Sequence, residues 1–365
     1  MHRFFDEGRE PIMTATSSRA SSSTTQSRRA RLAAAAQPVS PGPQTAALAQ
    51  GVGAAHAAAV TLSNASLRLD VLPHLGGGIA RFDWRGDNGA LVPVFRRCEH
   101  PETATDPNAL ACYPLLPYSN RIGGGRFECD GRSIAVPRNR RDEALPIHGD
   151  GWLARWQVDD ATDTTLQLSL DRASGAPYAF RAIQSFELDD TTLSIVLTIE
   201  NAGRARLPFG LGVHPFVVRD DATELAAAAD GLWLSGADFL PVRHVSVPPA
   251  WQFGVAYPLP ATLVNHAFTG WGGRATVSWP RRGLTLTVAA DADAYVLYTP
   301  PGEDFFCFEP VDHPINAVNL PGGAAANGMT LLAPGERLTR RFAFTVERAG
   351  ARSEAAAREA KRRRG

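Results

Sequence analysis

Two titratable residues in this chain are each followed by a proline: His214, in the run from Gly210 to Phe216, and Glu309, in Phe308-Glu309-Pro310. Because a proline ring restricts the preceding residue to extended backbone, each side chain is expected to project from a strand end or rim loop in a narrowly defined direction. A histidine titrates near neutrality, and partial burial raises the pKa of a glutamate towards it. Either dipeptide alone fits an ordinary strand end, but a third site at His148-Gly149 favours an acid and base pair.

The stretch from Tyr113 to Phe127 combines two prolines with the three consecutive glycines Gly123 to Gly125, which predicts a loop. It carries Tyr118, Asn120 and Arg121, whose side chains can stack on a ring or hydrogen-bond to hydroxyl groups. A phosphate-binding glycine loop is the rival interpretation, but the GxxxxGK[ST] pattern and a strand-loop-helix context are missing. A plain wide connection between sheet edges stays equally open.

Two further segments mix glycines, aromatic rings and hydrogen-bonding side chains. The segment from Pro146 to Trp152 contains His148 with glycines that would let backbone approach a ligand, and an indole that could flank it. The segment from Asn265 to Gly273 has the same character and includes Trp271. A pyranose presents hydroxyls at its edge and apolar C–H faces, so such mixtures suit a sugar, although no one loop establishes this.

The elements expected to position these residues are predicted to be strands. Apolar residues alternate in Leu166–Leu170, Leu284–Val288 and Phe342–Val346, and turn signals such as Asp189-Asp190 and Pro280 to Gly283 separate neighbouring runs. No amphipathic helix of normal length is expected. Some fifteen or more short strands in roughly 290 residues predict an all-β protein, a large antiparallel β-sandwich with two packed sheets in one domain.

The domain is expected to span residues 58–346, between two arms of different composition. Residues 1–57 are rich in Ser, Thr, Ala, Arg and Pro, which predicts a disordered arm, with an organelle-import segment as the alternative. Residues 347–365 are rich in Ala, Glu and Arg and predict a frayed helix or charged tail.

Composition narrows the classes of partner. Lys+Arg and Asp+Glu both total 37, so no basic field indicates nucleic acid, and a small neutral ligand fits this balance. No segment has the roughly 18 to 20 continuous apolar residues that span a bilayer. The four cysteines lack metal-site or disulfide spacing, so we expect reduced thiols in a cytoplasmic protein, monomeric or homodimeric. These cysteines are Cys98, Cys112, Cys129 and Cys307.

Taken together, the motifs resemble the aldose 1-epimerase (galactose mutarotase) family from about Leu67 to Val346. The matching segments, in chain order, are Pro73 to Gly78, Pro117 to Ile122, His148-Gly149, Val213 to Phe216, Phe268 to Trp271, and Glu309-Pro310. Each motif is short, but their order and separation along one chain are specific. The resemblance implies a galactose mutarotase-like supersandwich with a sugar cleft, no metal or organic cofactor, and interconversion of the α and β anomers of free aldohexoses.

On that resemblance Glu309 would be the general base and His214 the general acid. The residues expected to contact the sugar are Asn120, Arg121, His148, Asn265, Tyr118 and Trp271. Two departures from the family pattern bear on substrate identity: Asn265 stands where an acidic sugar ligand is usual, and Val217 stands where a second aromatic residue is common.

The reaction explains these residue types independently of the family. Anomer exchange removes a proton from the C1 hydroxyl and delivers one to the ring oxygen, and the opened aldehyde rotates about C1–C2 and closes again. Three alternatives stay open: a non-catalytic sugar-binding or sensor protein, a metal site formed by His148, His214 and Glu309, and a hexose-phosphate epimerase that uses Arg121 and Arg126.

Overall fold

The computed structural model describes residues 59–350 of the chain, which form 25 strands and a single α-helix of four residues, α1 (Gly323–Ala326). The predicted arm at residues 1–57 lies outside this range, as does most of the predicted tail. The last strand, β25 (Arg337–Arg348), continues two residues beyond the expected end of the domain. Within the described range no helix is long and apolar enough to cross a membrane.

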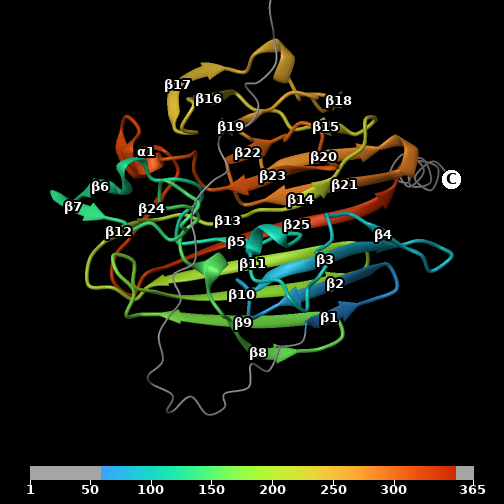
Figure 1. The fold of residues 1–365 in the computed structure, drawn as a ribbon, viewed down its shortest axis with the longest axis horizontal. Helices are drawn as coiled ribbons and strands as arrows, with labels where there is room; N and C mark the ends of the chain where they lie inside the picture. The colour runs from blue at the N-terminus through green and yellow to red at the C-terminus, as the bar shows by residue number, and fades with distance from the viewer. Residues whose placement is uncertain (1–58, 351–365) are drawn as a thin grey trace, which may run out of the picture. The chain divides into compact units, whose positions relative to one another are not determined.

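One layer of the fold is a nine-stranded antiparallel sheet, in the order β18-β15-β20-β21-β25-β11-β10-β9-β8 (Figure 1). The predicted turn at Asp189-Asp190 joins β10 to β11, with Asp190 in the left-handed region at φ 48°. The other strands of this sheet are β8 (Gln157–Ala161), β9 (Thr165–Arg172), β10 (Phe180–Asp189), β11 (Thr192–Asn201), β15 (Glu224–Ala226), β18 (Tyr257–Pro258), β20 (Arg274–Trp279) and β21 (Leu284–Ala290). All three alternating segments of the sequence are therefore strands of one sheet.

The facing layer contains an eight-stranded sheet and a four-stranded sheet. The eight-stranded sheet runs β17-β16-β19-β22-β23-β13-β5, and β14 pairs with β23 beside β13. Its strands are β5 (Pro114–Leu115), β13 (Gly212–Val213), β14 (Phe216–Val218), β16 (Gly231–Ser235), β17 (Pro241–Ser246), β19 (Asn265–Thr269), β22 (Ala294–Tyr298) and β23 (Phe305–Val311). The four-stranded sheet comprises β1 (Val60–Ser63), β2 (Leu67–Leu72), β3 (Gly78–Arg85) and β4 (Leu91–Pro93). There are also two small two-stranded sheets. One pairs β6 (Arg126–Cys129) with β7 (Arg132–Ala135), and the other pairs β12 (Leu207–Phe209) with β24 (Thr330–Leu332).

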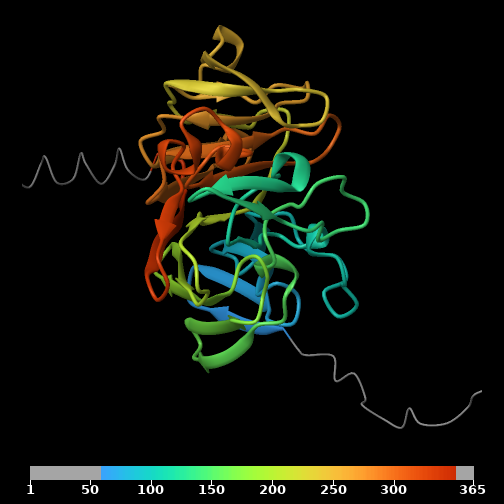
Figure 2. The ribbon, with the colours of Figure 1, turned by 90° about the vertical axis from the view of Figure 1, so that its left-hand side faces the viewer.

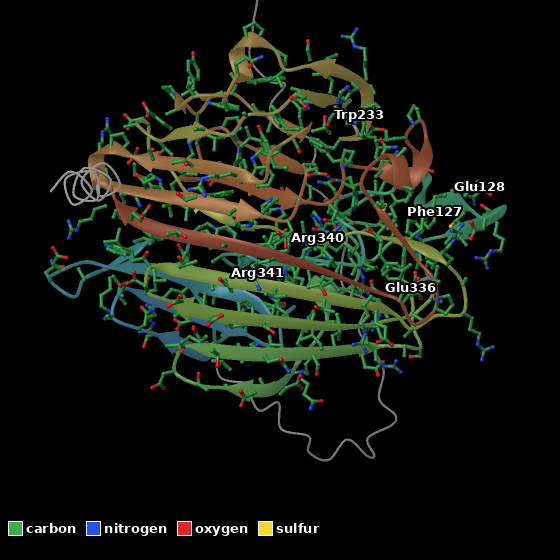
Figure 3. All side chains as sticks on the ribbon, turned by 180° about the vertical axis from the view of Figure 1, so that it is seen from behind. Phe127, Glu128, Trp233, Glu336, Arg340 and Arg341 are labelled. Atoms are coloured by element: carbon green, nitrogen blue, oxygen red, sulfur yellow. The ribbon has the colours of Figure 1, made fainter. Side chains whose placement is uncertain are left out.

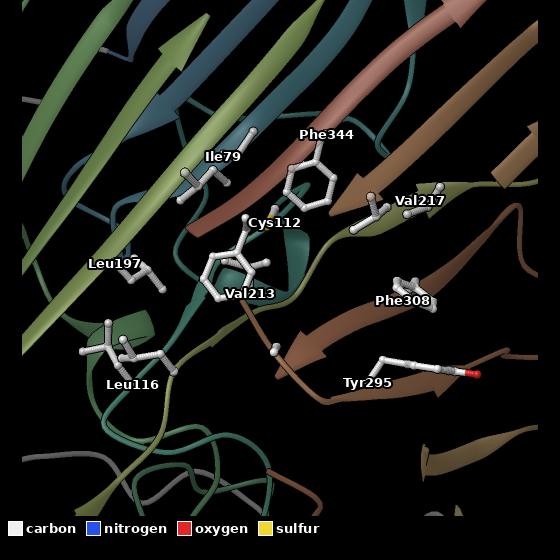
Figure 4. Packing of buried hydrophobic residues seen from close by; sticks show 14 of the residues in the cluster. Ile79, Cys112, Leu116, Leu197, Val213, Val217, Tyr295, Phe308 and Phe344 are labelled. Carbon is white, nitrogen blue, oxygen red and sulfur yellow. The ribbon is translucent and has the colours of Figure 1, made fainter. Parts of the chain in front are cut away.

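A single hydrophobic cluster joins the layers. It contains Leu69 of β2, Leu197 of β11 and Phe308 of β23, one from each of the three large sheets. Figure 4 shows Val213 inside this cluster, near Leu197 and Phe344. The antiparallel sandwich is thus confirmed, with the second layer divided between two sheets. In Figure 2 the blue strands of the four-stranded sheet and the yellow strands β16 and β17 lie at opposite ends.

The outer face of the nine-stranded sheet is polar, because alternate residues of each strand point away from the core. On β25, Phe342 and Phe344 are buried, whereas Arg341 points to solvent and is exposed (Figure 3). Strand β23 differs, since all seven of its residues are buried. Phe306 and Phe308 face the main core, whereas Phe305 and Cys307 belong to a second cluster on the opposite face. The loops that cover that second face enclose the candidate site.

Candidate functional site

His214 and Glu309 lie opposite each other across two strands. The pairings Gly212↔Val311, on β13, and Phe216↔Cys307, on β14, share one register along β23. His214 occupies the interruption between β13 and β14, so this register places it directly across from Glu309. His214 therefore stands at a strand end, as expected, whereas Glu309 lies inside a continuous strand that extends through Pro310 to Val311.

The two side chains contact each other, and the ring of His214 also packs against those of Tyr113 and Phe216, with ring centres 4.6 and 4.8 Å apart. His214 Nε2 lies 3.3 Å from Glu309 Oε1, and Glu309 is 2% exposed. The remaining polar atoms of the pair, His214 Nδ1 and Glu309 Oε2, are buried and have no hydrogen-bond partner within residues 59–350. Because buried polar atoms are nearly always paired, two orphans in one pair indicate a place where a ligand would supply the partners.

Burial shifts both pKa values towards the neutral forms. Loss of hydration raises the pKa of Glu309 to about 8, although the nearby positive charge of Arg121 opposes this. The same loss of hydration lowers the pKa of His214 to about 3, so the expectation that this histidine titrates near neutrality is wrong. Between these two values the pair as a whole holds one proton.

His148 and Asn120 hold each other by reciprocal hydrogen bonds. The backbone N–H of Asn120 donates to His148 Nδ1 at 3.0 Å, and the backbone N–H of His148 donates to the carbonyl oxygen of Asn120 at 3.0 Å. Both residues are in the left-handed region, at φ 56° and 59°, which non-glycine residues rarely adopt. Burial lowers the pKa of His148 well below its usual value, so the ring is neutral. Since Nδ1 accepts a hydrogen bond, the ring proton is on Nε2, which makes His148 a donor.

Arg121 is fixed on two sides. Its Nε and Nη2 donate to the carboxylate of Glu143 at 2.8 to 3.1 Å, and its guanidinium lies 5.1 Å from the ring centre of Phe239. Phe239 belongs to the loop between β16 and β17 and adopts φ 62°, unusual for a bulky residue. Arg121 Nη1 lies 3.4 Å from Asn120 Oδ1, which links this ion pair to the His148 motif.

These groups line one cavity of about 380 Å³. Six of the expected residues line it: Asn120, Arg121, His148, His214, Asn265 and Glu309. The sequence reasoning did not assign a further set of lining residues: Arg96, Asn108, Tyr113, Arg140, Glu143, Phe216, Phe239, Tyr298 and Phe305. Phe216 could have been predicted from the sequence, because alternation along a strand puts it on the same face as His214. The loop residues could not, since nothing in a sequence shows which way a loop folds back.

Two expected sugar contacts lie elsewhere. Tyr118 is 3% exposed and packs near the ring of Tyr178, and it does not line the cavity. Trp271 is 2% exposed, packs against Tyr295, and donates its Nε1–H to the carbonyl oxygen of Arg274. Both aromatic side chains are part of the main core. A fully buried ring removes more apolar surface from water than a half-exposed ring at a sugar site would, so the core position is the more stabilising one.

Two smaller expectations are also corrected. Val217 pairs with Phe306 and faces the main core, so its size does not affect a wall of the cavity. Gly149 does not make room for a ligand: a Cβ there would lie 2.3 Å from the carbonyl oxygen of Leu116, so the glycine permits close packing of two loops. Trp152 does line the cavity, with its ring 5.3 Å from that of His148.

No group of three or more His, Cys, Asp or Glu side chains within residues 59–350 is arranged to hold a metal ion. Two other depressions, of about 440 and 540 Å³, lie over β9 and β10 and beside α1. Neither contains a buried polar atom left without a partner, which distinguishes them from the cavity at Glu309.

Fold and site together define a β-sandwich protein with a cavity lined by polar, charged and aromatic side chains. The sequence profile of the aldose 1-epimerase family matches residues 58–345. The uncharacterized protein YphB of Escherichia coli K12 is 34% identical over 297 residues, which cover 79% of this chain and 98% of YphB. The chain belongs to the aldose 1-epimerase family.

Solved structures agree on the fold. The crystal structure of a candidate aldose 1-epimerase from Escherichia coli K12 has a TM-score of 0.73 at 33% identity, and covers 80% of this chain and 99% of that one. A galactose mutarotase-like protein from Clostridium acetobutylicum has a TM-score of 0.69 at 16% identity, and covers 80% and 95%. The expected galactose mutarotase-like supersandwich is therefore confirmed.

Proposed function

We propose that this protein is a mutarotase that interconverts the α and β anomers of a free aldohexose. The observation that carries this proposal is the buried His214–Glu309 pair, with Nε2 and Oε1 3.3 Å apart and one orphaned polar atom on each residue. Ring opening needs one group that takes a proton and one that gives a proton on the same sugar. A pair that shares a single proton supplies both.

In the forward direction, the shared proton first passes from Glu309 to His214, across the 3.3 Å between Oε1 and Nε2. Ionised Glu309 then takes the proton of the C1 hydroxyl as the ring oxygen receives a proton from His214. The electron pair of the O–H bond of the C1 hydroxyl forms the aldehyde carbonyl, and the C1–ring oxygen bond breaks with its electron pair staying on the protonated ring oxygen. After rotation about C1–C2, the two residues exchange roles and the ring closes as the other anomer. The pair holds one proton before and after the cycle, so no cofactor is required for balance.

The other lining residues hold the sugar in this proposal. Neutral His148 donates from Nε2, Asn120 and Asn265 offer amide groups to hydroxyls, and Arg121 polarises a sugar oxygen. Arg121 also lowers the pKa of Glu309 and so makes its ionised form more accessible. Asn265 lacks the charge of the family's usual acidic residue, so it recognises a hydroxyl as either donor or acceptor. The four buried free thiols fit a reducing compartment, and we propose a cytoplasmic location.

The test is optical rotation of freshly dissolved α-D-glucose and α-D-galactose. Acceleration over buffer that is lost in Glu309→Gln while sugar binding persists would support the proposal. If the wild-type protein binds these sugars without accelerating the change in rotation, it is a sugar-binding protein and the proposal fails.

A further inference from the structure

Arg121 reaches the cavity already neutralised. Glu143 accepts hydrogen bonds from both Nε and Nη2, and the two side chains are 14% and 26% exposed. A bidentate pair of this kind is strong because two parallel hydrogen bonds add to the charge attraction. Phe239 covers a face of the same guanidinium, so its position is fixed before any sugar binds.

The other two arginines of the cavity are also occupied. Arg140 donates to the carboxylates of Asp106 and Asp142, with contacts between 2.6 and 3.1 Å. Arg96 lies over the rings of Phe216 and Phe305, at 4.0 and 4.5 Å, and its Nη2 donates to two backbone carbonyl oxygens. Arg121 and Arg140 are therefore paired with carboxylates, whereas the charge of Arg96 meets only aromatic rings and backbone carbonyl oxygens. Arg126, on β6, does not line it.

We propose that Glu143 is a specificity-determining residue that makes the site prefer uncharged sugars over sugar phosphates. It acts through Arg121, by cancelling the charge that an anionic substituent would otherwise meet and by occupying two of the donors. This inference rests on the proposed function, because it concerns the substrate class of the same site. A phosphate that enters the cavity meets the Glu143 carboxylate and must displace it before it can pair with Arg121.

The test compares kcat/KM for D-glucose and D-glucose 6-phosphate in the wild type and in Glu143→Gln. The amide keeps the shape of the side chain but loses its charge. The ratio should move towards the phosphate by roughly ten- to hundredfold, the range for one charge-assisted hydrogen bond. Glu143→Asp, which keeps the charge, should retain most of the wild-type preference. The matched control is Asp130→Asn, which breaks the exposed Arg206–Asp130 pair and should leave the ratio unchanged.

An equal loss of activity on both sugars in Glu143→Gln, with no change in their ratio, would overturn the proposal, because it would show a structural role alone. Sugar binding separates this result from a failure of the proposed function. If the wild type accelerates neither reaction, saturation-transfer NMR of the same two sugars gives their relative affinities. A shift of that affinity ratio in Glu143→Gln supports the role of Glu143, and an unchanged ratio refutes it.

Discussion

Replacing Glu309 by glutamine should abolish most activity and stabilise the protein at the same time. The amide is close in shape to a protonated carboxyl but cannot take a proton from the C1 hydroxyl. General acid and base catalysis contributes roughly 10² to 10⁴-fold, so kcat should fall by at least the lower figure. Sugar affinity should change little, since the amide still offers hydrogen-bonding atoms to the ligand.

The stabilisation follows from the raised pKa of Glu309. Burial raises that pKa from 4.5 to about 8, so the folded state holds this proton where the unfolded chain has released it. Each pKa unit corresponds to about 1.4 kcal/mol, so ionised Glu309 costs the folded state about 5 kcal/mol. This cost is absent below pH 4.5, grows as pH rises from 4.5 to 8, and is constant above that. Glutamine never ionises and never incurs it.

The assay is thermal unfolding of wild type and Glu309→Gln at pH 5, 7 and 9. The advantage of the variant should grow with pH and approach a Tm difference on the order of 10 °C at pH 9. Glu128→Gln on β6 is the control, because Glu128 is exposed and away from the cavity (Figure 3). If the Tm difference between Glu309→Gln and wild type is the same at all three pH values, the buried raised pKa is refuted.

Three further outcomes are expected. The pH profile of kcat/KM, after subtraction of the spontaneous rate, should be level from about pH 5 to 7 and fall as pH rises through 8, because Glu309 then loses the proton that the pair shares; a rise through pH 8 would contradict a one-proton pair. Asn265→Ala should raise KM roughly 2- to 12-fold by polarimetry with kcat little changed, since an uncharged hydrogen bond contributes about 0.5–1.5 kcal/mol; a large fall in kcat would instead place Asn265 at the transition state. Gly149→Ala should lower the free energy of unfolding by about 2 kcal/mol or more in denaturant titrations, because its Cβ would overlap Leu116. The control is Gly89→Ala, at a positive φ with no atom within 4 Å, which should lose only the free energy that backbone strain at positive φ costs.

The sequence predicted the fold class well because strand periodicity is a local property. The alternating runs at Leu166–Leu170 and Phe342–Val346 both lie in the nine-stranded sheet, and the turn at Asp189-Asp190 is where the sequence placed it. The division of the second layer into two sheets could not be read from the sequence. An isolated bridge, Phe95↔Val217, connects the segment after β4 to β14, and such contacts join segments far apart in the chain.

The residues of the candidate site were likewise predictable from the sequence only in part. The dipeptides of His214 and Glu309 marked two residues that lie opposite each other at the cavity, because β13 and β14, on either side of His214, pair with β23 in one register. Aromatic residues were harder to assign, because a buried core ring and a ligand-facing ring have the same sequence appearance. Trp271 is a core residue, whereas Phe239, at an unremarkable position in the sequence, lies on Arg121 at the cavity. Glu143 was missed because its partner is 22 residues away and only the folded loop brings them together.

The residues of the candidate site come from two kinds of element, paired strands and loops. The His214–Glu309 pair is held by the sheet, because the register of β23 with β13 and β14 places the two residues opposite each other. Glu143 and Phe239 instead come from loops, which tolerate substitution better than paired strands. Exchanging loop residues such as these should therefore alter which sugar is accepted while the His214–Glu309 geometry, and with it the reaction type, is preserved.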